Sequence, residues 1–326
     1  MSPYMKATKI AIGSSLAIIA AYSLHLNYAV SAGIITLLTL QDTKKETLMV
    51  TLRRILAFFL SYLLAFLVFS LGDFTPIYYG IFLLFFTGIC FSFRLEDAIA
   101  MNAVLATHYL LEQNLSLIMI KNEALLLLIG SGIGILLNLY IPNNVRQIKS
   151  QQRAIETCLC NVLSSMAEYL HKTDSTTYNT QVLDELQAKI NQGIEQAYTN
   201  MNNTLFQESR YFLQYMEMRK EQYHILKQME EKIQSLTNAS PYSIEIADFM
   251  RNISITLSET QNAAGLLLIQ EDLHEQYKKR PLPKDREEFE TRATLYSILI
   301  HLQEFLLAKK RFVDSLSEDQ KLRYWQ

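Results

Sequence analysis

Several motifs on which common enzymes depend are missing from this sequence. It has no GxxxxGK[ST] or GxGxxG phosphate-binding loop and no GxSxG nucleophile turn, and its six histidines are scattered. The string HEQYK at His274 lacks the second histidine of a zinc-protease helix. We therefore expect neither an enzyme nor a bound metal or cofactor.

Cysteine is also scarce, since the chain contains only Cys90, Cys158 and Cys160. Three cysteines do not make a disulfide framework, and residues two positions apart on a helix point in different directions, so Cys158 and Cys160 make a poor metal pair. We interpret all three as packing residues. The formal net charge of −2 gives no basic face of the kind that binds nucleic acid.

Charged residues are rare in the first part of the chain. Residues 1–141 contain eight Lys/Arg and seven Asp/Glu, whereas the other 185 residues contain 22 and 25. Eight of the ten glycines also precede residue 141, and glycine is common in membrane helices. We predict an all-α protein with an N-terminal six-helix transmembrane domain over residues 1–141, followed by a cytosolic antiparallel helical bundle over residues 142–326.

The six spans follow from the polar breaks between apolar stretches. Residues 10–41 contain no formal charge, but as one helix they would be about 48 Å long, and two full spans need about 40 residues. We therefore predict two helices here, the second of only about 13 residues and about 20 Å. The other four spans are predicted over residues 55–71, 76–93 and 98–111 and in a last stretch that ends at Ile141, before a stop at residues 142–144.

The distribution of basic residues favours six spans over five. In a model with six spans, ten basic residues near the span ends fall on one side of the membrane and only Lys121 falls on the other. In a model with five spans, Lys6 and Lys9 change sides. The positive-inside rule then places both termini in the cytoplasm. The alternative is a cleaved signal peptide over residues 1–22, because two lysines precede an apolar run, but no clear cleavage site follows it.

From residue 145 onward, apolar residues recur three and four positions apart, which predicts helices. We expect five of them, with the first and last centred on the apolar stripes of residues 155–170 and 295–306. The charged stretch 217–232 is interpreted as a solvated helix face. The three helices between the first and the last of the five are predicted over residues 181–203, 208–237 and 242–277.

Polar residues within the apolar spans are the candidates for function. A charged residue at the bilayer centre costs about 2.5–3.5 kcal/mol, so such groups usually face a cavity or another helix. Asn102 and His108 lie about 120° apart on the fifth span and could border one cavity, although separate interhelical hydrogen bonds also explain them. We choose His108 as the candidate proton carrier, because histidine titrates in the physiological range.

Two further groups of residues are candidates for a pathway. Arg53, Arg54 and Arg94 are topology signals by default, but two loops could bring their guanidinium groups to one cytoplasmic mouth, where carboxylates bind. The second predicted helix ends early, and a helix end at membrane depth requires protein or water around its freed carbonyls. Gln41, Asp42 and Thr43 would then line the pathway, unless tilt and a thin bilayer complete the span.

Lys121 and Glu123 are charged residues at the predicted outer side. Lys121 either reaches the outer interface beside Glu112 or is a buried cation for an anionic substrate. Later in the same span, Gly130 and Gly134 have the spacing of close helix packing rather than of a phosphate loop.

A family resemblance joins these observations. The run SAGIITLLTLQDTKKETLMVTLRRILAFFLSYLLAF, residues 31–66, resembles the signature of the aromatic acid exporter family, in the wider group that includes fusaric acid resistance proteins. Ala57 and Ser61 stand where larger relatives often have glycine. Residues 280–312 are similar to the end of the family's cytoplasmic C-terminal domain. The positions that match the first motif are Gln41, Thr43, Thr47, Arg53 and Arg54.

The resemblance implies efflux of aromatic carboxylic acids or related amphipathic organic anions through the plasma membrane. It implies secondary rather than ATP-driven transport, a cytoplasmic C-terminal domain and, because larger relatives carry two such membrane halves, a homodimer. The alternative is a membrane-anchored helical scaffold or regulatory interaction protein. Polar residues within the spans favour transport, because a mere anchor needs none, while the long charged helices favour the scaffold.

Overall fold

The described part of the chain is entirely helical and divides into two compact units. No strand occurs among these residues, which confirms the all-α prediction. One unit contains Met1–Asn143 and Asn202–Gln207, and the other contains Asn144–Met201 and Glu208–Gln326. The predicted stop at residues 142–144 lies outside the described residues. The computed structural model describes residues 3–140, 145–171, 180–204, 210–236, 240–258 and 261–325.

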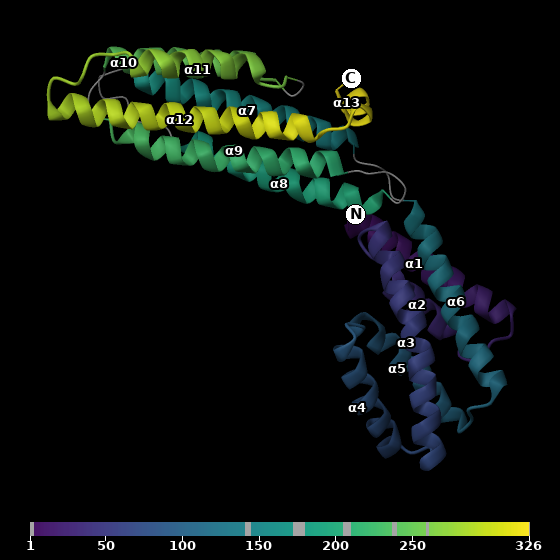
Figure 1. Cartoon of the computed structure of the whole chain (residues 1–326). Coiled ribbons are helices and arrows are strands. Elements are labelled where there is room, and N and C mark those ends of the chain that lie inside the picture. The colour runs from purple at the N-terminus through teal and green to yellow at the C-terminus, as the bar shows by residue number, and fades with distance from the viewer. Residues whose placement is uncertain are drawn as a thin grey trace. The chain divides into compact units, whose positions relative to one another are not determined.

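The first unit contains six α-helices at the positions of the six predicted spans (Figure 1). Two of them, α3 and α6, are long and apolar enough to cross a membrane, and α2 and α4 are shorter apolar helices. That all six cross the bilayer stays a prediction. The helices are α1 (Pro3–Ser23), α2 (Val30–Thr39), α3 (Lys44–Leu71), α4 (Pro76–Ser92), α5 (Ile99–Glu112) and α6 (Leu117–Leu139), with a 3-10 turn η1 (Glu96–Ala98) before α5.

Helix α2 is the shortest of the six, with 10 residues and a length of about 15 Å. It packs against α1 and α6, and glycines of α6 permit the close approach. A Cβ atom at Gly130 would lie 2.6 Å from the carbonyl oxygen of Ala32, and one at Gly134 would lie 2.9 Å from Cβ of Thr39. The predicted role of Gly130 and Gly134 in helix packing is confirmed.

The Gly130→Ala substitution is expected to destabilise the first unit. Its new methyl group meets backbone rather than a flexible side chain, and overpacking of this kind costs about 1–3 kcal/mol. Gly132→Ala is the matched control, because no atom lies within 4 Å of a Cβ there, and alanine favours helix by about 1 kcal/mol. Thermal unfolding of the purified protein in detergent should give a lower midpoint for Gly130→Ala only. Equal midpoints would contradict the close approach of α2 and α6.

The second unit is a helical bundle around one apolar core (Figure 1). Helix α7 packs on α10, α9 packs on α12, and α11 lies along α12. On α9 the charged residues of the stretch 217–232 are exposed or half-buried as predicted, with the exception of Arg219, which is fully buried. The other face of the same stretch packs into the core. The described helices are α7 (Val145–His171), α8 (Gln181–Asn203), α9 (Arg210–Gln234), α10 (Pro241–Thr256), α11 (Ala264–Lys278), α12 (Arg286–Ser315) and α13 (Glu318–Tyr324).

The prediction of one helix over residues 242–277 was wrong, because two helices, α10 and α11, occupy this stretch. Leu257 turns to an extended conformation with ψ 115°, and Ala263 adopts a left-handed φ of 59°. The side chain of Asn262 then accepts a hydrogen bond from the backbone N–H of Ala264 at 3.1 Å. Polar residues that bond to nearby backbone compete with helix, which explains the break.

Candidate functional site

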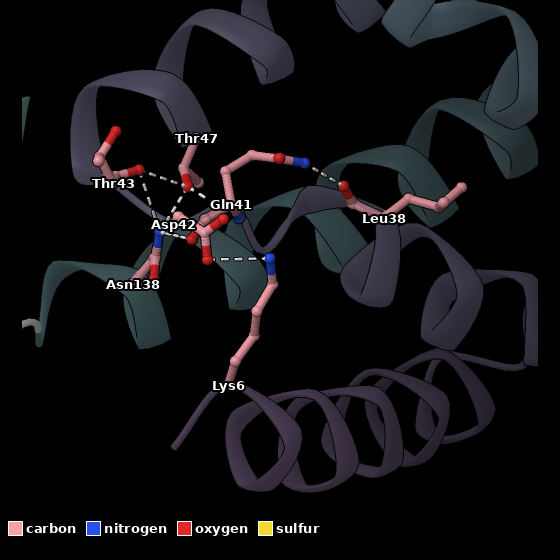
Figure 2. Close-up of polar contacts among 7 residues, drawn as sticks. All are labelled: Lys6, Leu38, Gln41, Asp42, Thr43, Thr47 and Asn138. Atoms are coloured by element: carbon pink, nitrogen blue, oxygen red, sulfur yellow. Dashed lines mark hydrogen bonds and ion pairs between the residues drawn. The ribbon is translucent and has the colours of Figure 1, made fainter. Parts of the chain in front are cut away.

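The connection between α2 and α3 is held by a side chain from α6 (Figure 2). Nδ2 of Asn138 donates to the backbone carbonyl of Gln41 at 3.0 Å and to that of Thr43 at 3.3 Å, and it also contacts the hydroxyl of Thr47. Thr43 caps α3 by accepting from the backbone N–H of Glu46 at 3.3 Å. Two carbonyls of the connection that follows the early end of α2 are therefore bonded within the protein.

The three predicted pathway residues of this connection differ in exposure. Thr43 is buried, Gln41 is half-buried and donates its side-chain amide to the carbonyl of Leu38 at 2.9 Å, and Asp42 is exposed. The carboxylate of Asp42 pairs with Nζ of Lys6 at 3.0 Å, as Figure 2 shows. That Gln41, Asp42 and Thr43 line a pathway stays a prediction.

Asn138 was not among the predicted site residues, although its place in the sequence gave a signal. It is an uncharged polar residue near the end of an apolar span, where a polar side chain requires a partner. Its side chain is 1% exposed.

The Asn138→Ala substitution is expected to destabilise the end of α2. It leaves the carbonyl of Gln41 without its donor, whereas the carbonyl of Thr43 still accepts from the backbone N–H and the hydroxyl of Thr47. An unsatisfied buried polar group costs about 1–3 kcal/mol. Gln41→Ala is the matched control, because it removes only the bond to Leu38 and keeps the Gln41 carbonyl. Hydrogen exchange should rise in peptides covering residues 38–47 for Asn138→Ala and stay near the wild-type rate for Gln41→Ala. The reverse order would contradict this assignment.

A second group, the arginine cluster, consists of Arg53, Arg54, Asp97, Thr39 and Asn102. The Arg54 side chain is buried, and it donates from Nε to the backbone carbonyl of Asp97 at 3.1 Å and from Nη1 to the hydroxyl of Thr39 at 3.2 Å. No carboxylate of the described residues forms an ion pair with Arg54, whereas the more exposed Arg53 pairs with Asp97 at 3.0 Å. Arg54 thus lies at the C-terminus of α2, where a helix carries partial negative charge.

Asn102 joins this cluster, and Arg94 stays outside it. Nδ2 of Asn102 donates to the carbonyl of Ala98 at 3.0 Å and lies 3.4 Å from that of Arg54, while its Oδ1 is buried with no hydrogen bond to a described residue. Arg94 is exposed in a left-handed turn after α4, with φ 57°. Of the three predicted arginines, the structure brings Arg53 and Arg54 together at Asp97.

The third group, the histidine cluster, consists of Tyr28, Ser31, His108, Asn122 and Glu123. Nδ1 of His108 lies 2.7 Å from Oε2 of Glu123, and its Nε2 lies 3.1 Å from the hydroxyl of Ser31. The Tyr28 ring stacks on the imidazole with 4.1 Å between centroids. Asn122 donates to the other carboxylate oxygen of Glu123 at 3.0 Å.

The His108 and Glu123 side chains are 5% and 0% exposed, so the two titratable groups are buried against each other. Their separation of 2.7 Å is that of a hydrogen bond between an imidazole nitrogen and a carboxyl oxygen. Glu123 was singled out from the sequence beside Lys121, but its link to His108 was not foreseen. Lys121 itself is exposed, as reaching the interface would require.

Helix α2 connects the two clusters. Ser31, in its first turn, contacts His108, and Thr39, its last residue, contacts Arg54. Eight residues separate them, which corresponds to about 12 Å along the helix axis. His108 and Asn102, predicted to border one cavity, belong to different clusters.

The comparisons with known proteins cover both units. The family model "Aromatic acid exporter family member 1" matches residues 1–141, and "Putative aromatic acid exporter C-terminal domain" matches residues 146–310. The chain belongs to the aromatic acid exporter family. This membership confirms the resemblance found in the sequence and supports a membrane protein of a transporter type.

Two other proteins are similar to this chain. The uncharacterized protein YqjA of Bacillus subtilis (strain 168) is 28% identical over 304 residues, which cover 93% of this chain and 94% of the relative. A crystal structure described as a putative membrane protein from Clostridium difficile 630 is 29% identical, with a TM-score of 0.48, and covers 52% of this chain and 99% of that chain.

Proposed function

We propose that this protein exports aromatic carboxylic acids or related amphipathic organic anions by secondary transport. In this proposal it is a homodimer in the plasma membrane, all six helices of the first unit cross the bilayer, and the second unit lies in the cytoplasm. Family membership supports the transporter class. The substrate class, the coupling and the assembly are the parts that we add.

The environment of Arg54 is the observation that supports an anionic substrate. A buried guanidinium group is costly unless an anion or several hydrogen bonds compensate it, and Arg54 has two neutral acceptors and no carboxylate partner among the described residues. A planar guanidinium with further free N–H groups suits a carboxylate, which accepts two parallel hydrogen bonds. We propose that Arg54 binds the substrate carboxylate and that the half-exposed Arg53 attracts the anion as it approaches.

The His108–Glu123 pair supports proton coupling. An imidazole and a carboxyl group are buried against each other, and Ser31 links them to the helix whose other end contacts Arg54. A proton that binds at the pair changes the charge at one end of α2, while an organic anion binds at the other end. Proton entry and anion exit can therefore be linked through one short helix.

Transport can be tested in proteoliposomes. We expect benzoate to cross faster than in protein-free vesicles when a proton gradient is imposed, and to lose that advantage when an ionophore removes the gradient. The Arg54→Gln protein should show an apparent KM raised at least about tenfold, since hydrogen bonds to charged groups contribute about 1.5–3 kcal/mol. Arg53→Gln is the matched control, because Arg53 is half-exposed and already paired, so its effect should be smaller.

Unchanged benzoate flux with and without the protein, at every gradient tested and with several aromatic acids, would remove the transport proposal. The scaffold alternative would then explain the chain better. An Arg54→Gln protein that melts at the wild-type temperature yet keeps the wild-type KM would remove Arg54 from the substrate site.

A further inference from the structure

A surface cavity lies in the second unit, where the chain passes from α11 to α12. Its volume is about 320 Å³, which is within the range of about 300–1,000 Å³ for small-molecule sites. It is formed by the end of α11, the connection that follows it and the first turns of α12. The lining residues are Tyr277, Lys278, Arg280, Pro281, Leu282, Pro283, Phe289, Arg292, Ala293 and Tyr296.

The lining carries charge of one sign. It includes the cations Lys278, Arg280 and Arg292 and no carboxylate. Each cation has an acidic partner, but those partners, Glu275, Glu245 and Glu288, are not part of the lining. An anion that enters the cavity therefore contacts three positive groups directly, while their carboxylate partners lie behind the lining.

Aromatic rings hold the two arginines in place. The Arg280 guanidinium lies 4.3 Å from the ring centroid of Tyr242 and 4.6 Å from that of Tyr277, and Arg292 lies 4.4 Å from the Tyr242 ring. Arg292 also donates to the carbonyl of Pro281 at 2.6 Å. Stacking fixes the plane of a guanidinium group, and a fixed plane loses less entropy when it binds a carboxylate.

Several donors at this site have no acceptor. Nη1 of Arg280, Nε of Arg292 and the hydroxyl of Tyr277 are buried and form no hydrogen bond with any described residue. Burial raises the pKa of Tyr277 to about 12, so its hydroxyl keeps its proton and can donate. Unsatisfied buried donors are costly, and native proteins usually provide a partner, a water molecule or a ligand.

The cavity also presents apolar surface. The side chain of Phe289 is 60% exposed and that of Leu282 is 89% exposed, and both belong to the lining. The ring of Tyr296 completes this surface. Exposed large apolar residues beside convergent polar groups are typical of a site for a small amphipathic molecule.

We propose that this cavity binds a small aromatic carboxylate, whose carboxylate group pairs with Arg280 and Arg292 and whose ring packs on Phe289. The bound molecule places its carboxylate beside the cations of the lining and covers the exposed ring. This site belongs to the second unit and uses neither Arg54 nor His108, so binding here does not require transport.

Hydrogen exchange of the full-length protein in detergent, with and without benzoate, tests the proposal at the site itself. We expect benzoate to slow exchange in peptides covering residues 277–296, while benzyl alcohol and inorganic phosphate do not. Benzyl alcohol lacks the carboxylate and phosphate lacks the ring. Protection by phosphate alone, or no protection by any aromatic acid at millimolar concentration, would overturn the proposal.

Two surface substitutions test it without disturbing the fold. Phe289→Ala and Lys278→Gln change exposed side chains, and we expect each to weaken benzoate binding at this site several-fold. Tyr198→Ala and Lys310→Gln are matched controls, because these side chains are similarly exposed and lie outside the lining. Equal protection by benzoate in all four proteins would show that the cavity is not its site.

The outcomes for this site and for transport are separable. Protection of residues 277–296 in a protein that moves no benzoate would leave this inference standing while the transport proposal fails. Benzoate flux without protection at these residues would do the opposite.

Discussion

The Glu123→Gln protein is expected to lose proton-driven transport, with a flux at least about tenfold lower than wild type and little remaining dependence on pH. Glutamine has nearly the shape of glutamate, so Asn122 keeps a neighbour, but the carboxyl group that contacts Nδ1 of His108 is replaced by an amide, which does not take up or release a proton. The variant therefore keeps the packing of the pair and lacks one of its two ionisable groups.

Flux of benzoate into or out of proteoliposomes, measured over a series of internal and external pH values, checks this expectation. His108→Gln should have a similar effect, because the same contact is lost from the other side. Glu112→Gln is the matched control, since Glu112 is an exposed carboxylate that accepts from the hydroxyl of Tyr28 at 2.9 Å. If the Glu123→Gln protein folds and keeps the pH profile of wild type, the pair is not the proton site.

Arg219→Met is expected to destabilise the second unit strongly, by about 3–5 kcal/mol. The Arg219 side chain is fully buried and forms an ion pair with Glu156, which is itself 16% exposed. Its guanidinium also donates to Gln222, whose amide donates to the carbonyl of Phe305 at 2.8 Å. Without Arg219 the carboxylate of Glu156 stays largely buried and loses its main counter-charge.

The effect of Arg219→Met should depend on pH with a definite sign. Burial alone would raise the pKa of Glu156, but Arg219, the hydroxyl of Tyr215 and Lys309 together hold it below its usual value. In the wild-type protein this group therefore adds stability above the unfolded pKa of about 4.3, and the contribution is lost as the pH falls through the lower folded pKa. In the variant, protonation relieves a buried charge, so the destabilisation should be smaller near pH 4 than at pH 7.

Native-state hydrogen exchange of peptides from α7 and α9 gives the local free energy of unfolding for this comparison. Arg311→Met is the matched control, because Arg311 pairs with Glu221 on the surface, with side chains 61% and 51% exposed. Exposed pairs contribute about 0–1 kcal/mol, so this variant should remain close to wild type at both pH values. A destabilisation by Arg219→Met that is equal at both values would contradict the role given to Glu156.

Composition and hydrophobic periodicity were enough to predict the helical class and most helix positions of this protein. Scarce charge over residues 1–141 located six apolar segments, and each corresponds to a described helix. The packing role of Gly130 and Gly134 was predicted correctly as well, because their spacing of four residues places both on one face of α6. Helix positions and glycine spacing depend on residues that are close in the chain, so they can be predicted from a single sequence. The break inside residues 242–277 was missed because its polar residues fit a helical pattern as well as a turn.

Which polar side chains contact one another depends on how the helices pack, and patterns in the sequence did not predict it. His108 and Glu123 lie on two helices joined by a turn, and helical periodicity gives the face of each helix without giving the register between them. Asn138 bonds to the carbonyls of Thr43 and Gln41, which lie 95 and 97 residues earlier in the chain. This contact was not predicted either, because it also depends on the register between two helices. Arg53 and Arg54 are adjacent in sequence, yet one is half-exposed and paired while the other is buried without a carboxylate. Burial and pairing are properties of packed helices, because they depend on what lies opposite each side chain.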